Sequence, residues 1–153
     1  MEKVCCFTGH REINQNERAS VTAALRKLLP SLIEQGYRVF KAGGAIGFDM
    51  LAAGEVIRLK RNFPDIKLHL FLPCMTQNKY YNEEQNRVYL EQINAADKIF
   101  CMSEKYYNGC MQDRNRALVD GSELCIAYIK KESGGTAYTV SHAEKNGVEV
   151  VRL

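Results

Sequence analysis

The chain has 153 residues, enough for one domain with a full hydrophobic core, and we expect a single domain over residues 1–153. With 46% hydrophobic and 25% charged residues it has the composition of an ordinary globular protein. The sequence contains no run of about 18 apolar residues, so no membrane span is expected. The net charge of +3 is small and dispersed, so nucleic acid is not expected as a partner.

The six cysteines form no C-x-x-C pair, and no Cys/His set has the spacing of a zinc site, so no metal is expected. Several fall in predicted strands, which favours buried, reduced thiols in a cytoplasmic protein. The N-terminal residues lack the pattern of a signal peptide, which agrees with a cytoplasmic location.

The first strand is predicted at residues 4–8, an apolar run that ends in Gly9-His10-Arg11. Arg11 carries a planar fork of donors that suits phosphate, although it could instead pair with Glu12. His10 is a candidate ligand contact, with a hydrogen-bonded structural role as the alternative.

A helix is predicted over residues 16–35, where apolar residues recur at helical spacing. Gly36 stands where a C-terminal cap glycine belongs, and Pro30 is expected to kink or locally disrupt the helix. A strand at 38–42 follows.

Three glycines lie between that strand and a helix predicted at 50–62, namely Gly43, Gly44 and Gly47. Glycine admits a ligand close to the backbone and adopts positive φ, and the N–H groups that open a helix are unpaired at the positive end of its dipole. The turn therefore suits a phosphate, although its spacing is neither G-x-G-x-x-G nor a P-loop. A tight turn that binds nothing is the alternative.

The Asp49 carboxylate would stabilise the first turn of that helix even without a ligand. If a nucleotide binds, we expect Asp49 to contact ribose hydroxyls rather than phosphate, because like charges repel. If the glycine turn is the site, Gly44→Val should block binding without unfolding the protein.

The third strand is predicted at 67–72, with His69 as a structural residue within it. The polar loop at 74–82 carries Tyr80 and Tyr81, whose rings could stack on a base or pack on the following helix, predicted at 83–95.

A fourth strand is predicted within 97–102, followed by a loop with Tyr106 and Tyr107 as further candidates for base stacking. The next helix, at 110–120, carries Arg114 and Asn115 near its N-terminus, where an anion is favoured; a solvated helix face is the alternative.

The last predicted elements are a strand at 124–129, a helix at 137–146 and a strand at 148–152. A second glycine turn, Gly134-Gly135-Thr136, opens that helix.

The alternation of six strands and five helices implies a mostly parallel sheet with helices on both faces, an α/β/α three-layer architecture. In such sheets ligands bind beyond the carboxyl ends of the strands, where the strand order reverses. Both glycine turns, the arginines and the tyrosines all follow strands, so we expect them on one rim, which suits a nucleotide or a related phosphorylated ribose.

Four short motifs in series resemble the YpsA-like family of the SLOG superfamily, named for the SMF/DprA and LOG proteins. They are Phe7-Thr8-Gly9-His10-Arg11, Gly43-Gly44-Ala45-Ile46-Gly47-Phe48-Asp49, Arg114-Asn115-Arg116-Ala117-Leu118-Val119-Asp120 and Gly134-Gly135-Thr136. The resemblance implies a Rossmann-like fold that binds nucleotide-derived ligands, through Gly9, Arg11, Gly43, Gly44, Gly47, Asp49, Arg114, Asn115, Gly134, Gly135 and Thr136.

The chain departs from the LOG branch, which resembles a phosphoribohydrolase with the signature P-G-G-x-G-T-x-x-E. Thr139 takes the place of that glutamate, so catalysis is absent or another acid, such as Asp49, Glu83 or Glu84, supplies it. The DprA branch resembles a single-strand DNA binder, whose strong basic surface is not evident in this sequence.

Our first hypothesis is a non-catalytic domain that binds or senses a nucleotide-type ligand such as ADP-ribose, NAD or a nucleoside monophosphate, with no catalytic residue and no certain cofactor identified. The alternatives are a phosphoribohydrolase or N-glycosidase acting on a nucleoside monophosphate, and a protein-interaction scaffold. Pairing through helices in related proteins makes a homodimer plausible.

Overall fold

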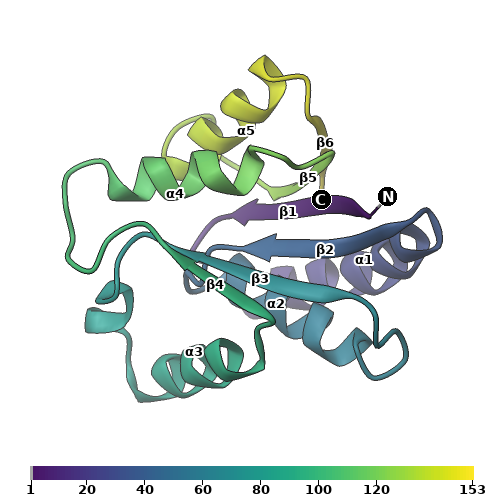
Figure 1. The fold of residues 1–153 in the computed structure, drawn as a ribbon, viewed down its shortest axis with the longest axis horizontal. Helices are drawn as coiled ribbons and strands as arrows, with labels where there is room; N and C mark the ends of the chain where they lie inside the picture. The colour runs from purple at the N-terminus through teal and green to yellow at the C-terminus, as the bar shows by residue number, and fades with distance from the viewer. Residues whose placement is uncertain (1) are drawn as a thin grey trace.

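The chain folds into a Rossmann-like three-layer α/β/α domain, and the computed structural model describes residues 2–153 of it (Figure 1). All strand pairs are parallel, in the order β4-β3-β2-β1-β5-β6, which confirms the predicted fold class. The strands are β1 (Lys3–Gly9), β2 (Tyr37–Ala42), β3 (Lys67–Leu72), β4 (Lys98–Cys101), β5 (Leu124–Tyr128) and β6 (Glu149–Arg152).

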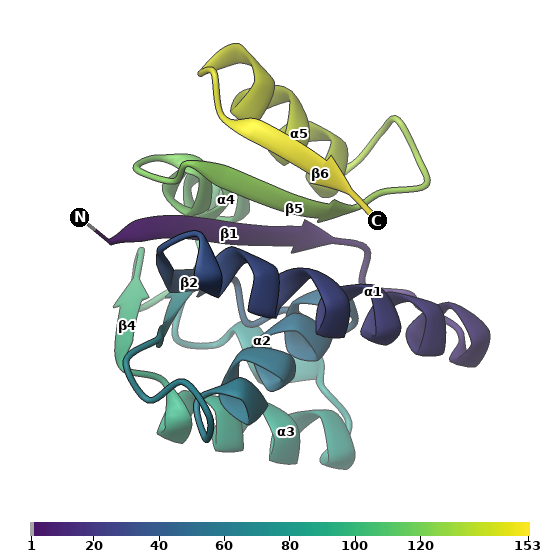
Figure 2. The same cartoon turned by 90° about the vertical axis from the view of Figure 1, so that its right-hand side faces the viewer.

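The helices fall into two layers. They are α1 (Gln15–Glu34), α2 (Phe48–Leu59), α3 (Glu83–Ala95), α4 (Cys110–Val119) and α5 (Gly135–Lys145). Helix α2 packs between α1 and α3 on one face of the sheet, and α4 packs with α5 on the other (Figure 2). The chain order reverses between β1 and β5, so the junction of these two strands is the switch point at which such folds bind ligands.

The core between the sheet and the first helical layer is built on Phe7, Phe40 and Phe48, which are fully buried. Burying each ring contributes about 1.5–3 kcal/mol relative to exposure. A Cβ atom on Gly9 would lie 2.4 Å from the Phe48 ring, so β1 must end in a residue without a side chain for α2 to pack here.

Helix α1 continues through Pro30 as far as Glu34, so the proline does not interrupt the helix. Its missing N–H removes one backbone hydrogen bond from a helix of 20 residues. The predicted cap is confirmed, because Gly36 has φ +101° and donates its N–H to the Ile33 carbonyl at 3.1 Å. The loop expected at 74–82 contains a 3₁₀ turn, η1 (Gln77–Tyr80), that the sequence did not predict.

All six cysteines are free, and five of them are buried, while Cys101 is half-buried. No helix within residues 2–153 has the length and hydrophobicity needed to cross a membrane. His69 is half-buried beside Phe100, with 5.8 Å between ring centroids.

Candidate functional site

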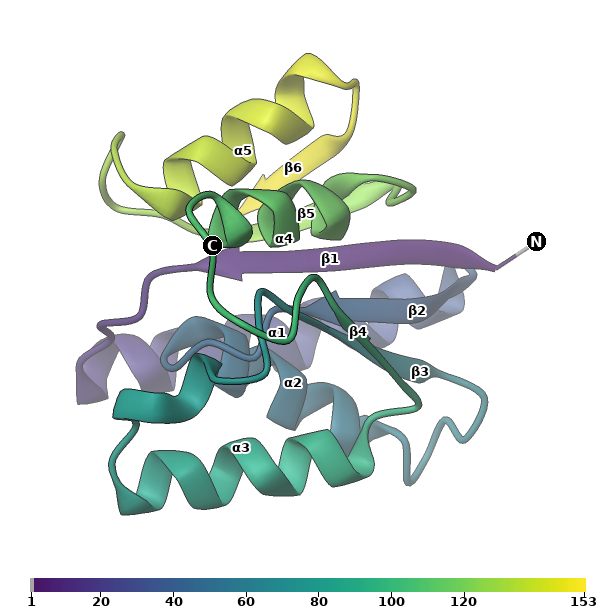
Figure 3. The same ribbon diagram turned by 60° about the vertical axis from the view of Figure 1, so that its left-hand side comes forward.

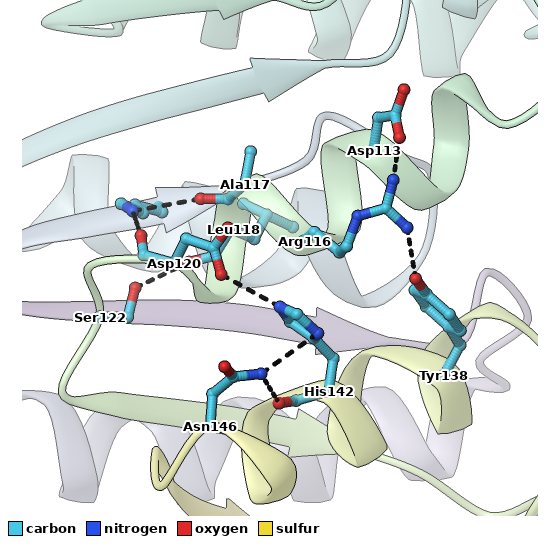
Figure 4. Close-up of polar contacts among 10 residues, drawn as sticks. Asp113, Arg116, Ala117, Leu118, Asp120, Ser122, Tyr138, His142 and Asn146 are labelled. Carbon is cyan, nitrogen blue, oxygen red and sulfur yellow. Dashed lines mark hydrogen bonds and ion pairs between the residues drawn. The ribbon is translucent and has the colours of Figure 1, made fainter.

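A cavity of about 490 Å³ lies at the carboxyl ends of β1 and β5. Figure 3 shows the end of β1, the loop before α5 and the start of α4 on the same side of the molecule. The structure brings nine of the predicted site residues together around this cavity: Gly9, His10, Arg11, Asp49, Arg114, Asn115, Gly134, Gly135 and Thr136.

The glycine turn before α5 is open toward solvent. Gly134 is the N-cap of α5, has φ +93° and is exposed, and no side chain caps the helix. A Cβ on Gly134 would have no atom within 4 Å, and one on Gly135 would meet only Asn115 Nδ2 at 3.7 Å. The first N–H groups of α5 have no intrahelical acceptor, so this helix end is a ready site for an anion.

The glycine turn between β2 and α2 is instead filled by the protein itself. The Gly43 N–H donates to Asp49 Oδ2 at 3.2 Å, and a Cβ on Gly43 would lie 2.6 Å from Arg114 Nη1. A Cβ on Gly47 would lie 2.3 Å from the Arg11 carbonyl oxygen. These glycines therefore make room for protein groups.

Gly43, Gly44 and Gly47 do not line the cavity, which differs from the sequence-based expectation that they admit a phosphate. Gly44 is buried with φ +72°, and its carbonyl accepts a hydrogen bond from the Tyr81 hydroxyl at 3.0 Å. The first N–H of α2, on Phe48, donates to the His10 carbonyl at 3.1 Å, so the start of α2 is covered by the loop after β1.

Asp49 and Arg114 form the buried wall of the cavity, with only 6% and 4% of their surfaces exposed. Burial raises the pKa of the Asp49 carboxyl, whereas the Arg114 charge and the N–H groups of Ala45 and Gly43 lower it. Burial lowers the pKa of Arg114, and the Asp49 charge opposes that shift.

The Arg114 guanidinium is already engaged by the protein. Its Nη1 donates to the Gly43 carbonyl and to Gln77 Oε1, and its Nε donates to Asn115 Oδ1 at 2.9 Å. Arg114 therefore ties α4 to the β2–α2 turn and orients Asn115, while its charge is balanced by Asp49.

Arg11 is the guanidinium that remains available. Its side chain is exposed, and within residues 2–153 it makes no hydrogen bond or ion pair. It lines the cavity and three neighbouring ones, so it stands at their junction.

The four predicted stacking tyrosines divide into two pairs. Tyr80 and Tyr106 are 89% and 63% exposed and line a neighbouring cavity of about 540 Å³, together with Arg11 and Lys79. The Tyr81 ring packs at right angles to Tyr89, which realises the alternative of packing on the next helix. The Tyr107 hydroxyl donates to Asp113, which raises the pKa of Tyr107 to about 12.

Four polar residues that line the cavity were not among the predicted site residues: Thr8, Gln112, Lys131 and Ser133. Lys131 and Ser133 directly precede the Gly134-Gly135 turn, so the signal that could have found them was their position in the same loop.

The carboxylates named as alternative catalytic acids are placed differently. Asp49 is the one acidic residue that lines the cavity, whereas Glu84 lines a groove between α2 and α3. Thr139 is buried, and its hydroxyl donates to the Gly135 carbonyl at 2.8 Å, so it stabilises the first turn of α5.

Comparisons with known proteins agree with the fold. The family model of the YspA SLOG family matches residues 5–150. A UPF0398 protein (BH1768) from Halalkalibacterium halodurans is 29% identical over 94% of this chain and 81% of the relative.

Two solved structures share the fold. DNA processing protein A (DprA) from Helicobacter pylori is 20% identical, with a TM-score of 0.68 over 98% of this chain and 64% of that one. DprA from Streptococcus pneumoniae is 18% identical, with a TM-score of 0.69 over 99% of this chain and 50% of that one. This chain therefore spans between half and two thirds of the DprA chains.

The expectation that nucleic acid is not a partner is wrong, because the Helicobacter pylori protein with this fold is described by its single-stranded DNA binding mode.

Proposed function

The chain belongs to the YspA SLOG family, and we propose that its cavity at the β1–β5 switch point binds the phosphate of a nucleotide-type ligand, such as ADP-ribose, NAD or a nucleoside monophosphate. One observation carries the proposal: the uncapped N-terminus of α5 at Gly134-Gly135 and the unpaired Arg11 line the same cavity. Helix N-termini and guanidinium groups both bind phosphate well in proteins, the first through its free N–H groups and dipole, the second through paired charge-assisted hydrogen bonds.

The other residues around the cavity suit the rest of such a ligand. Lys131 adds a second positive charge near the phosphate, and Asn115 and Ser133 offer polar groups for ribose hydroxyls. A cavity of about 490 Å³ falls within the range of ligand sites, about 300–1,000 Å³. The adjoining cavity, which shares Arg11 and Met111, places Tyr80 and Tyr106 where they could cover a base.

Calorimetric titration with AMP, ADP-ribose, NAD and ribose 5-phosphate tests the proposal. Gly135→Val should abolish binding while the protein stays folded. A Cβ on Gly135 meets only Asn115 Nδ2, at 3.7 Å, so the new side chain fits the protein and occupies space in the cavity. Gly54→Val is the matched control: its Cβ also meets a single amide nitrogen, Gln92 Nε2, at 3.7 Å, and it lies in α2 away from this cavity.

The result separates the competing functions. Binding by the wild type and the Gly54→Val variant, lost in Gly135→Val, with the ligand recovered intact, supports a binding domain. Release of free base from AMP, lost in Asp49→Asn, would favour a phosphoribohydrolase instead. Equal affinities for the two valine variants would contradict the site, and no binding of any ligand would favour a scaffold.

Single-stranded DNA is a second candidate ligand, favoured by the exposed Tyr80 and Tyr106 beside Lys79 and Arg11. Aromatic faces next to basic groups are the usual platform for single strands, and each stacked base is worth about 1–3 kcal/mol. Fluorescence anisotropy with a labelled oligothymidine should show salt-dependent binding that Tyr80→Ala weakens. Binding that is insensitive to salt and to this change would argue against it.

A cytoplasmic location and a homodimer stay predictions.

A further inference from the structure

The loop that carries the open glycine turn is attached to the loop after β1 through one histidine. His10 Nε2 accepts a hydrogen bond from the Lys130 backbone N–H at 2.7 Å. The His10 ring also packs edge-on against Tyr128, the last residue of β5, with 6.0 Å between centroids. These contacts hold the imidazole between β1 and the segment of residues 130–135, which we call the phosphate loop.

We propose that His10 is a positioning residue that fixes the phosphate loop through its neutral imidazole, and that protonation of His10 releases the loop and weakens ligand binding in acid. The effect on binding rests on the proposed function, whereas the attachment of the loop can be tested without any ligand.

The chemistry of the contact sets the direction of the switch. Nε2 accepts the Lys130 N–H only while it carries no proton, so the neutral ring holds its proton on Nδ1. Once Nε2 is protonated, two N–H donors face each other and the hydrogen bond is lost. Lys130 lies five residues before Gly135, so the release acts directly on the turn that opens α5.

The charged groups around His10 favour its neutral form. Burial lowers the pKa of His10, and the Lys131 and Lys130 charges lower it further, while Glu17 on α1 raises it. Glu17 is itself engaged, because it pairs with the Lys130 ammonium and accepts the Tyr128 hydroxyl. Burial and the two lysine charges therefore lower the pKa of His10 from its ordinary value, which favours the neutral imidazole that the Lys130 contact requires.

Two variants separate the roles of the ring. His10→Gln places an amide oxygen near the position of Nε2 and does not titrate, so it should keep the loop attached at every pH. His10→Leu removes the acceptor and should leave the loop detached at every pH.

The first readout needs no ligand. The ¹⁵N–¹H signal of Lys130 and its hydrogen exchange are followed from pH 8 to pH 5, corrected for the intrinsic pH dependence of exchange. The wild type should titrate, with protection of the Lys130 amide falling about three- to tenfold in acid, the worth of one hydrogen bond. His10→Gln should stay protected, and a wild-type amide that does not titrate would overturn the proposal.

The second readout is the affinity for AMP at pH 7.5 and pH 5.5. The phosphate of AMP also titrates in this range, but it does so equally for every variant. The wild type should lose about three- to tenfold more affinity than His10→Gln. Equal losses would overturn the coupling to binding, and a relative gain in acid would show that His10⁺ contacts the phosphate directly, which contradicts a positioning role.

The two proposals fail in different ways. If AMP and the other nucleotides do not bind but the Lys130 amide titrates with His10, the proposed function fails and the attachment of the loop stands. If AMP binds and the Lys130 amide is indifferent to pH, the attachment fails and the proposed function stands.

Discussion

Replacing Gly44 by alanine should destabilise the fold strongly, although Gly44 lies in the turn where the sequence alone predicts a ligand contact. Gly44 has φ +72°, a conformation that costs a residue with a side chain about 1–2 kcal/mol. A Cβ there would also lie 2.9 Å from Leu72 Cδ2 and 3.1 Å from Gln77 Nε2, and overpacking of this kind costs about 1–3 kcal/mol more. The free energy of unfolding should therefore fall by about 2–5 kcal/mol.

Gly147 offers a matched control, because it has the same φ of +72° but nothing within 4 Å of a Cβ. Gly147→Ala should lose only the backbone contribution, about 1–2 kcal/mol. Urea unfolding followed by circular dichroism measures both variants. Equal losses would refute the conclusion that the protein fills the turn around Gly44. They would instead favour a turn that is open to a ligand, as the sequence alone predicts.

Three further predictions concern charge. Arg114→Met should lower the free energy of unfolding by about 3–5 kcal/mol, because it leaves the Asp49 charge buried alone. Adding Asp49→Asn should recover part of this loss, as measured by urea unfolding. No recovery would contradict an electrostatic coupling between Asp49 and Arg114. The free energy of unfolding should fall as the pH drops below about 6.5, because burial lowers the pKa values of His10 and His69 in the folded state and the unfolded chain therefore takes up protons first. The double variant His10→Gln, His69→Gln should show a smaller slope of the urea midpoint against pH. An equal slope would exclude these histidines as the cause. Arg11→Ala should change the free energy of unfolding by less than about 0.5 kcal/mol, because the guanidinium is exposed. It should weaken AMP binding about tenfold or more in calorimetry, because the guanidinium bonds the ligand. Unchanged affinity would remove Arg11 from the site.

The position of the site could be predicted from the sequence because it follows from topology. Alternating strand and helix periodicity implies parallel strands, and parallel strands bring all their carboxyl ends to one edge. His10, Arg114 and Gly134 are far apart in the sequence, and they meet at one cavity for this reason. Amphipathic periodicity also gave most element boundaries to within two residues, as for α3 at 83–95.

Which glycine turn is open could not be predicted, because both turns look alike locally. The turn at Gly43 is closed by Arg114, a residue 71 positions later in the sequence, whereas the turn at Gly134 has no such neighbour. Tyr80 and Tyr81 differ for the same reason: they are adjacent in the sequence, but only Tyr81 reaches the Gly44 carbonyl. Contacts between distant residues decide these cases.

We propose that the open turn before α5, rather than the glycine turn after β2, holds the phosphate. Backbone amide chemical shifts recorded during an AMP titration test it most directly, because the two turns report separately. We expect large, saturable shifts at Gly134, Gly135 and Thr136, with small ones at Gly43 and Gly44. Dominant shifts at Gly43 and Gly44, with the signals of 134–136 unmoved, would contradict it.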